Sequence, residues 1–431
     1  MNLLGAFVNA FKVPDLRRKI GFTFLIIVIY RFGAHVPTPG IDVQTAQEFA
    51  AGGGGGIVQF INLFSGGALT QMAVFALGIM PYITSSIIMQ LLTVVIPKLE
   101  AWSKEGESGY KKITQWTRYL TVVLALLQST GLAFLFHRGQ IQDPAGNPVD
   151  LIPNFNGPRV GLIVLSLTAG TALIMWLGEL ITQRGIGNGM SILIFASIVS
   201  TLPSEGNAIL AQKGLGTFLT ICVLGIGIIV AIVVMEQGQR RIPVQYAKRV
   251  VGRRMYGGSS TYIPLKVNQA GVIPIIFASS VLYIPTLLQN TIQNRGLQNF
   301  IENNLVNPRA ATYMILYGLM VVFFAYFYTA ITFNPVDVSD NIKKYGGFIP
   351  GIRPGRQTAE YLDRILTRIT LPGALFIAAI ALLPSIFLAT QNIQALPFGG
   401  TSILIAVGVT LETMKQIESQ LMMRHYEGFL K

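Results

Sequence analysis

The side chains that could do chemistry in this sequence are few, because its long apolar runs contain almost no ionisable residues. Glu179, Glu236 and Glu412 lie at or near the ends of such runs, and Arg31 lies near the end of the first one. Ion-coupled carriers and proton pumps usually need a charged group inside the membrane, so this scarcity argues against both. It also argues against intramembrane proteolysis, which needs paired aspartates, a zinc motif or a Ser/His pair.

Motifs for nucleotides, metals and redox chemistry are missing as well. No G-x-x-x-x-G-K-[ST] occurs, and the G-I-G-N-G at 185–189 lacks the lysine and the strand–helix context of a phosphate loop. We interpret that stretch as a tight turn between two spans. His35, His137 and His425 are too far apart in sequence for metal-ligand spacing, and Cys222 is the only cysteine, so it has no partner for a disulfide within the chain. The sequence therefore predicts no catalytic residues, no metal, no cofactor and no enzymatic activity.

What remains is apolar chemistry. Ile79, Ile83 and Ile87 recur every four residues and share one face of a predicted helix. Polar residues occupy the neighbouring faces, namely Thr84, Ser85, Ser86 and Gln90. Pro81 should kink or widen this helix. Two interpretations stay open: the isoleucines face lipid or another helix, or they form a hydrophobic constriction that gates by excluding water.

A short amphipathic piece, 57–69, precedes this helix and follows five consecutive glycines at 52–56. It is too short and too polar to cross a bilayer, which needs about 20 apolar residues. A half-helix beside a full span is typical of the centre of channels and transporters. The glycine run and the pair Gly66 and Gly67 would give it hinges at both ends. The alternative is a flexible external loop with an interfacial helix.

The composition places all of these features in a membrane. The chain has 431 residues, of which 52% are hydrophobic and only 12% charged, against about 25% charged in a soluble protein. We predict an all-α polytopic membrane protein with ten spans. The predicted spans are approximately 20–36, 72–96, 113–136, 160–180, 190–202, 217–235, 270–288, 312–333, 369–389 and 400–414.

The basic residues orient these spans. Of the 32 Lys and Arg residues, 26 fall on the side that holds both termini and the long loops. The positive-inside rule puts that side in the cytoplasm and explains most of the net charge of +13 without nucleic acid. The loops at 236–269 and 334–368 are longer than topology requires. Their basic residues, mixed with Tyr, Gly and Pro, favour ordered hairpins that dock a partner, although they could also serve topology alone.

Ten spans divide into two sets of five, 1–203 and 204–431, joined by a predicted loop at 203–214. An odd number of spans in each half forces the halves to be inverted relative to one another, if they share a fold. Inverted repeats place the working site at their interface near the bilayer midplane.

Motifs in order along the whole chain resemble those of the SecY family of protein-conducting channel subunits, its bacterial branch most of all. They include R-F-G-A-H-V-P-T-P-G-I-D, F-S-G-G-A-L, W-S-K-E-G-E-S-G, M-W-L-G-E-L-I-T-Q-R-G-I-G-N-G, L-K-V-N-Q-A-G-V-I-P and F-I-P-G-I-R-P-G. The five-glycine run is not among the family motifs. The resemblance implies a clam-shell of two inverted five-helix halves around a central hourglass pore. Spans two and three would face spans seven and eight across a lateral gate to lipid.

The resemblance also assigns roles to particular residues. The pore ring would be Ile79, Ile83, Ile194, Ile276 and Ile405. The plug that closes the outer funnel would be formed by Ile57, Phe60, Ile61, Leu63, Phe64, Ser65, Gly66, Gly67 and Leu69. The loop residues that contact the ribosome or a motor ATPase would be Arg240, Arg241, Arg253, Arg254, Lys343, Lys344 and Arg353.

By the same resemblance, the expected function is a passive pore in the bacterial cytoplasmic membrane. It would translocate unfolded secretory polypeptides and release membrane segments laterally, driven by a motor ATPase or the ribosome. The implied partners are SecE, SecG, the SecA motor ATPase, the ribosome, signal sequences and nascent chains, the lipid bilayer, and an association with YidC or SecDF. The alternative from another class is an inverted-repeat secondary transporter of small solutes, which predicts the intramembrane charge that the sequence lacks.

Overall fold

The computed structural model describes residues 11–41, 65–137, 152, 155–246, 249–251, 254–256, 260–289, 295–307, 310–391 and 400–427. Helices dominate, and each of the ten predicted spans contains one. In chain order the elements of the first part are α2 (Pro14–Gly33), α5 (Met80–Val95), α6 (Pro97–Lys104), α7 (Glu107–His137), α8 (Gly157–Arg184) and α9 (Gly189–Gln237). Those of the second part are β1 (Gln239–Tyr246), β2 (Arg249–Val251), β3 (Arg254–Tyr256), β4 (Ser260–Lys266), α10 (Ile273–Gln289), α11 (Arg295–Ile301), the π-helix η1 (Glu302–Val306), α12 (Ala311–Thr332), α13 (Pro335–Lys344), β5 (Gly347–Phe348), α14 (Arg356–Gln391) and α15 (Gly400–Glu427).

Several of these helices meet the physical requirements for crossing a membrane. Five helical stretches of the described chain are long and apolar enough: Gly157–Arg184, Gly189–Ala211, Gly214–Gln237, Ala311–Lys344 and Arg356–Leu383. The number rises to six if α5 and α6, which are bent by 100° at Ile96, form one broken span.

The second predicted span begins later than expected and ends where expected, at Val95. Its helix, α5, begins at Met80 rather than near residue 72, because 65–79 forms a series of turns with positive φ at Gly66, Gly67, Met72 and Gly78. Pro81 therefore occupies the first turn of α5, where its missing N–H is harmless. The predicted kink at Pro81 is therefore wrong. Residues 97–112, between the second and third predicted spans, are mostly helical as well, in α6 and in the start of α7.

The predicted loop between the two halves is replaced by helix. α9 continues through Pro203 as far as Ala211, and the only non-helical backbone inside it is at Gly214, with φ 79° and ψ 175°. Glycine adopts positive φ without the steric penalty of a Cβ atom, so the helix breaks at this residue. The connection between the halves is therefore a single glycine break.

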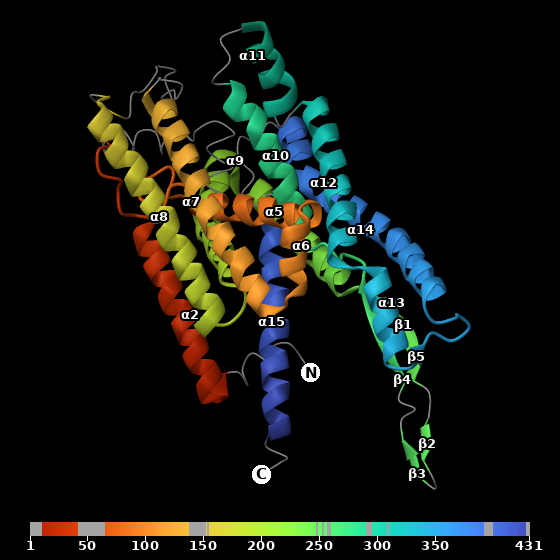
Figure 1. Ribbon diagram of the computed structural model, residues 1–431. Helices are drawn as coiled ribbons and strands as arrows, with labels where there is room; N and C mark the ends of the chain where they lie inside the picture. The colour runs from red at the N-terminus through yellow and green to blue at the C-terminus, as the bar shows by residue number, and fades with distance from the viewer. Residues whose placement is uncertain are drawn as a thin grey trace.

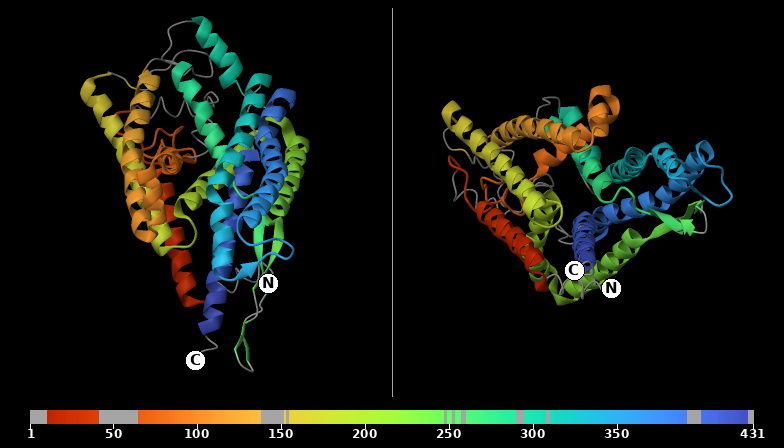
Figure 2. Two further views of the ribbon diagram at one scale, coloured as in Figure 1. Left: turned by 45° about the vertical axis from the view of Figure 1, so that its right-hand side comes forward. Right: turned by 60° about the horizontal axis from the view of Figure 1, so that its bottom comes forward.

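The helices form two groups that follow the order of the chain. Figure 2 shows α2, α7 and α8 in red to yellow on one side, and α10, α12 and α14 in teal to blue on the other. α5 lies across the middle of the molecule and α15 runs down from it (Figure 1). Both described ends of the chain lie on the same side as β1 to β5, which agrees with the topology predicted from the basic residues.

The first long loop is a β-hairpin, as predicted. β1 pairs antiparallel with β4, from Gln239 opposite Lys266 to Gln245 opposite Ser260. The short pair of β2 and β3 extends the hairpin outward (Figure 1). The second long loop is not a hairpin: it forms α13, the short strand β5, which joins the other edge of β1, and the first turns of α14. A small core that includes Ile242, Val244 and Ile342 holds the two loops together.

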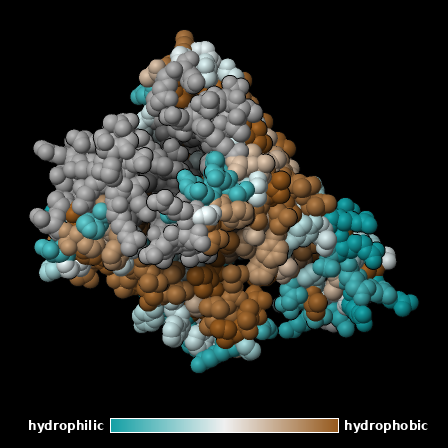
Figure 3. Space-filling view, turned by 90° about the horizontal axis from the view of Figure 1, so that it is seen from above, coloured by the Kyte–Doolittle hydropathy of each residue, from teal (hydrophilic) through white to brown (hydrophobic). Residues whose placement is uncertain are grey.

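Apolar side chains cover much of the outside of the helices. Phe24 and Phe32 on α2 are 67% and 74% exposed, and Val223 on α9 is 69% exposed. Figure 3 shows hydrophobic residues over much of the described surface seen from above, with a hydrophilic group toward one corner. Extensive exposed apolar surface on a monomer must be shielded from water, and a bilayer around the helices would shield it.

Candidate functional site

Isoleucines from four separate parts of the chain meet in one buried cluster. It contains Ile79 at the start of α5, Ile194 on α9, Ile276 on α10 and Ile405 on α15, none more than 8% exposed. Ile83 is partly buried and packs against the same cluster. The cluster therefore joins both predicted halves of the chain, and Ile79 faces protein rather than lipid. All five residues assigned to the pore ring lie in or against it.

Ile87, the third isoleucine of the sequence motif, occupies a different position. It is partly buried and packs against the isoleucine cluster and against a second cluster, which contains Ile275, Phe277 and Val321. These residues come from α10 and α12. Ile87 therefore lies where α5 meets the helices of the predicted lateral gate.

The predicted plug is described only at its end. Ile57, Phe60, Ile61, Leu63 and Phe64 lie outside the described residues. Ser65 and Leu69 are fully buried, and Gly66 and Gly67 have φ values of +64° and +86°. A Cβ atom on Gly66 would stand 2.8 Å from a guanidinium nitrogen of Arg31 and 3.0 Å from Cα of Ser197. The glycine pair thus lets the backbone approach α2 and α9 closely.

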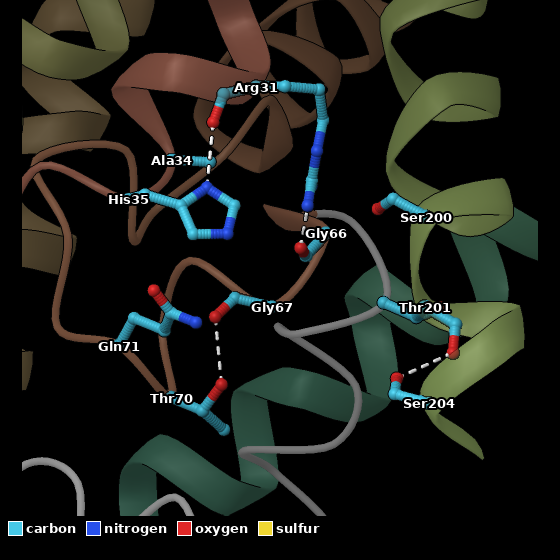
Figure 4. A pocket seen from close by; sticks show the side chains of 10 residues that line it. All are labelled: Arg31, Ala34, His35, Gly66, Gly67, Thr70, Gln71, Ser200, Thr201 and Ser204. Carbon is cyan, nitrogen blue, oxygen red and sulfur yellow. Dashed lines mark hydrogen bonds between the residues drawn. The ribbon is translucent and has the colours of Figure 1, made fainter. Parts of the chain in front are cut away.

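Three polar side chains hold this glycine pair in place, and the sequence motifs did not single out two of them, Tyr30 and Ser197. The Tyr30 hydroxyl of α2 lies 2.6 Å from Oγ of Ser197 on α9 and 3.4 Å from the Ser65 carbonyl oxygen. Arg31 donates to the Gly66 carbonyl at 2.9 Å (Figure 4). Tyr30 and Ser197 are both fully buried. In the sequence, Tyr30 stands out only as a polar residue next to Arg31, the one arginine of the first predicted span. Its spacing from Ser197 gives no sign that the two side chains meet.

Two arginines bond the backbone on either side of residues 42–64, which include most of the predicted plug. Arg159, at the start of α8, donates from Nε to the Gly40 carbonyl at 2.8 Å. Gly40 lies just before the stretch 42–64. Arg31 makes the equivalent bond to Gly66, just after residue 64. Both belong to the six Lys and Arg residues that the topology places on the outer side. They are the two of these whose side chains the structure describes, and each bonds a backbone carbonyl.

The basic loop residues are presented to solvent on the opposite side. Arg240 and Arg241 on β1, Lys343 and Lys344 at the end of α13, and Arg353 are all exposed. The Arg241 guanidinium lies 4.9 Å from the ring centroid of Tyr262 on the partner strand β4, a cation–π contact. Arg254 belongs to β3, and Arg253 lies outside the described residues. The two loops therefore form one basic surface, because β5 pairs with β1.

The base of this hairpin is tied to the helices by Asn268. Its amide donates to the Glu236 carboxylate at the end of α9 and to the Gly271 carbonyl, at 3.2 Å, before α10. We expect Asn268→Ala to deprive the partly buried Glu236 carboxylate of a hydrogen-bond donor and to cost about 1–3 kcal/mol locally. Trypsin should then cleave the hairpin several-fold faster in isolated membranes. Asn304→Ala, which removes an exposed amide bonded to the Phe300 carbonyl, is the control, and equal cleavage rates in both variants would contradict this role of Asn268.

Comparison of the sequence with known proteins gives one consistent family. The family model of SecY matches residues 73–414. The chain is 57% identical to the protein translocase subunit SecY of Streptomyces coelicolor over 437 residues, with 100% of both chains covered. It is 53% identical to the protein of the same description from Mycobacterium tuberculosis over 443 residues, again with 100% of both covered.

Solved structures share the fold at lower identity. A structure described as that of a protein conducting channel superposes with a TM-score of 0.63 and 16% identity, covering 95% of this chain and 96% of that one. A SecY structure described for its plug domain, which stabilises the closed state of the translocation channel and maintains a membrane seal, gives 0.61 and 16%, with the same coverage. Sec61 from the canine ribosome–channel complex of the endoplasmic reticulum gives 0.60 and 15%, also with that coverage. The chain is thus a multi-pass helical membrane protein, and it belongs to the SecY family.

Proposed function

We propose that this chain forms the pore through which unfolded polypeptides cross a membrane, and that the isoleucine cluster is its constriction. The observation that carries the proposal is the meeting of Ile79, Ile194, Ile276 and Ile405 from both halves of the chain. The relatives are translocase subunits, and solved structures with this fold are protein-conducting channels. A channel is therefore favoured over an inverted-repeat solute transporter, and the family is not one of enzymes.

Branched aliphatic side chains suit such a constriction. They exclude water, and a hydrophobic constriction without water does not pass ions. They also offer no hydrogen bond that would hold a polypeptide during its passage. Because the described residues carry no nucleotide motif, the energy for transport must come from outside, by chain elongation on the ribosome or by a motor ATPase.

We further propose that membrane segments leave sideways between α5 and α7 on one side and α10 and α12 on the other. Ile87 supports this path, because it bridges α5 to the cluster of α10 and α12 through apolar contact alone. A signal sequence that inserts there would gain about 0.3–0.6 kcal/mol for each leucine that enters lipid. The two halves would separate about the break at Gly214, because α9 continues through the predicted boundary at 203.

The exposed basic surface formed by β1, β5 and α13 is the proposed docking site for the ribosome and for the SecA motor. The canine Sec61 structure is described as part of a ribosome–channel complex, which supports a ribosome as one partner. SecE, SecG, YidC and SecDF stay expectations from the family. We propose the bacterial cytoplasmic membrane as the location, with both termini in the cytoplasm, because 26 of the 32 basic residues fall on that side.

A photo-cross-linker tests the pore directly. Placed at Ile276 in membranes that hold an arrested secretory chain, it should capture that chain, because the constriction surrounds whatever passes. The same cross-linker at Ile226, on the lipid-facing side of α9 and 62% exposed, should not. Capture at both positions alike, or at neither, would contradict the assignment of the pore.

A further inference from the structure

The hydroxyl pair of Tyr30 and Ser197 has more hydrogen-bond acceptors than protons. The Tyr30 hydroxyl lies 2.6 Å from the Ser197 hydroxyl and 3.4 Å from the Ser65 carbonyl. The Ser197 hydroxyl also lies 2.9 Å from the Leu193 carbonyl, one turn back along α9. Each hydroxyl has a single proton to donate, so the three contacts cannot all be made at once.

Two proton arrangements satisfy the pair. In the first, Ser197 donates to Tyr30, and Tyr30 donates to the Ser65 carbonyl. In the second, Tyr30 donates to Ser197, and Ser197 donates to the Leu193 carbonyl. Both protons are used in each arrangement, but only the first requires Ser65. Because Tyr30 and Ser197 are fully buried, a hydroxyl left without an acceptor there would be strongly unfavourable.

We propose that Tyr30 and Ser197 are positioning residues that form a two-state hydrogen-bond switch for residues 65–67. The first arrangement holds Ser65 when these residues are docked against α2 and α9. The second keeps both hydroxyls satisfied when Ser65 withdraws, so withdrawal is reversible and leaves no buried polar group unpaired. The inference rests on the proposed function and adds that residues 65–67, the described end of the predicted plug, move when the channel opens.

The contact between Arg31 and the Gly66 carbonyl can also be broken without leaving a polar group unpaired, but for a different reason. A cavity of 260 Å³ borders Arg31, His35, Gly66, Gln71 and Ser200 (Figure 4). Its size and polar lining admit water. Water can therefore replace the Gly66 carbonyl at the Arg31 guanidinium when the two separate. Tyr30 does not line this cavity, so its hydroxyl depends on Ser197 for a substitute partner.

The switch also reaches the proposed constriction. Tyr30 belongs to the isoleucine cluster itself, and its ring stacks on Phe75 with 5.9 Å between centroids. Ser197 lies one turn beyond Leu193 on α9, next to Ile194 and Ile198 of the same cluster. Movement of residues 65–67 would therefore change the contacts of side chains that pack directly against the isoleucines.

The two hydroxyls predict effects of opposite sign. Among the described residues, Tyr30→Phe leaves the Ser65 carbonyl with only the 3.4 Å contact from the Ala68 amide. Ser197 still bonds Leu193, so withdrawal is favoured. Ser197→Ala leaves Tyr30 with Ser65 as its single acceptor, so docking is favoured. A role in packing alone would move both variants in the same direction. Ser197→Thr keeps the hydroxyl and should restore the behaviour of the unmodified protein.

Thiol labelling measures docking without any transported chain. Ser65→Cys keeps the backbone carbonyl and places a thiol at a fully buried position, in a Cys222→Ser background that removes the only other cysteine. A membrane-impermeant maleimide added from outside should label Cys at 65 about fivefold faster with Tyr30→Phe and about fivefold slower with Ser197→Ala. Tyr326→Phe, which removes an exposed hydroxyl bonded to the Thr367 carbonyl, should leave the rate unchanged.

Changes of the same sign in the two variants, or no change in either, would overturn the switch. The proposed function would survive that result, because the cross-link at Ile276 tests it independently. Conversely, opposite signs in labelling with no capture at Ile276 would support the switch and reject the pore. Thermal unfolding of both purified variants separates a change in docking from a general loss of folding.

Discussion

A chain with Ile276→Asn is expected to leak ions when no polypeptide is being transported, on the order of tenfold more than the unmodified channel. Ile276 is 8% exposed and lies among Ile79, Ile194 and Ile405. An amide buried there has no partner among these apolar side chains, and such burial without hydrogen bonds is strongly unfavourable. The amide would therefore recruit water, and a constriction that holds water passes ions. Conductance of single channels in a planar bilayer measures the effect.

The matched variant is Ile276→Leu, which keeps the volume and the apolar surface. Its leak should stay close to that of the unmodified protein, because volume-conserving swaps in a core perturb packing little. A comparable leak in the Leu and Asn variants would show that the fit of the side chain, and not the exclusion of water, controls the seal. Unchanged conductance in the Asn variant would remove Ile276 from the constriction.

Gly189→Ala is expected to lose most of its folded protein. Gly189 begins α9, directly after the tight turn at 185–188, and its amide donates to the Thr182 hydroxyl of α8 at 2.9 Å. A Cβ atom there would overlap the Gly178 carbonyl oxygen and approach Cβ of Ile181 to 2.9 Å. Both neighbours are in the body of α8, so the two helices must separate. Overpacking of this kind costs about 3 kcal/mol.

The yield of monodisperse protein in detergent and its midpoint of thermal unfolding measure this loss. Gly227→Ala on the same helix is the control, because a Cβ atom at Gly227 meets nothing within 4 Å. Alanine is also the better helix former, so that variant should be at least as stable as the unmodified protein. If Gly189→Ala matched it, the close approach of α8 and α9 would not be needed to place Ile194.

The spans and the hairpin could be predicted because their signals are local. Apolar runs predicted a helix at each of the ten places, and basic residues mixed with Tyr, Gly and Pro in the first long loop predicted the hairpin that β1 and β4 form. The tight turn at 185–189 followed from its glycines and from Asn188, whose side chain caps α9. In each case one continuous stretch of the chain contains the whole pattern.

The errors arose where distant contacts outweigh local preference. Residues 72–79 are apolar enough to continue α5, yet they form turns, in part because Ala73 pairs with Pro37 and the Val74 amide bonds the Val36 carbonyl. A loop is predicted to begin at Pro203, but α9 continues past this residue, although proline disfavours helix interiors. Tyr30 and Ser197 are 167 residues apart, and no spacing rule relates them. The isoleucine face of α5 was visible, whereas its meeting with Ile194, Ile276 and Ile405 required the family resemblance.

The two arginine contacts at Gly40 and Gly66 have a consequence for how this protein can vary. Both guanidinium groups bond backbone carbonyls, which every amino acid provides. The anchors therefore impose no sequence on the stretch between them, and lengthening a loop whose ends are fixed costs only about 0.6 kcal/mol for each doubling. A change in length at the glycines of 52–56 would therefore leave both anchors intact, with Arg31 and Arg159 in place.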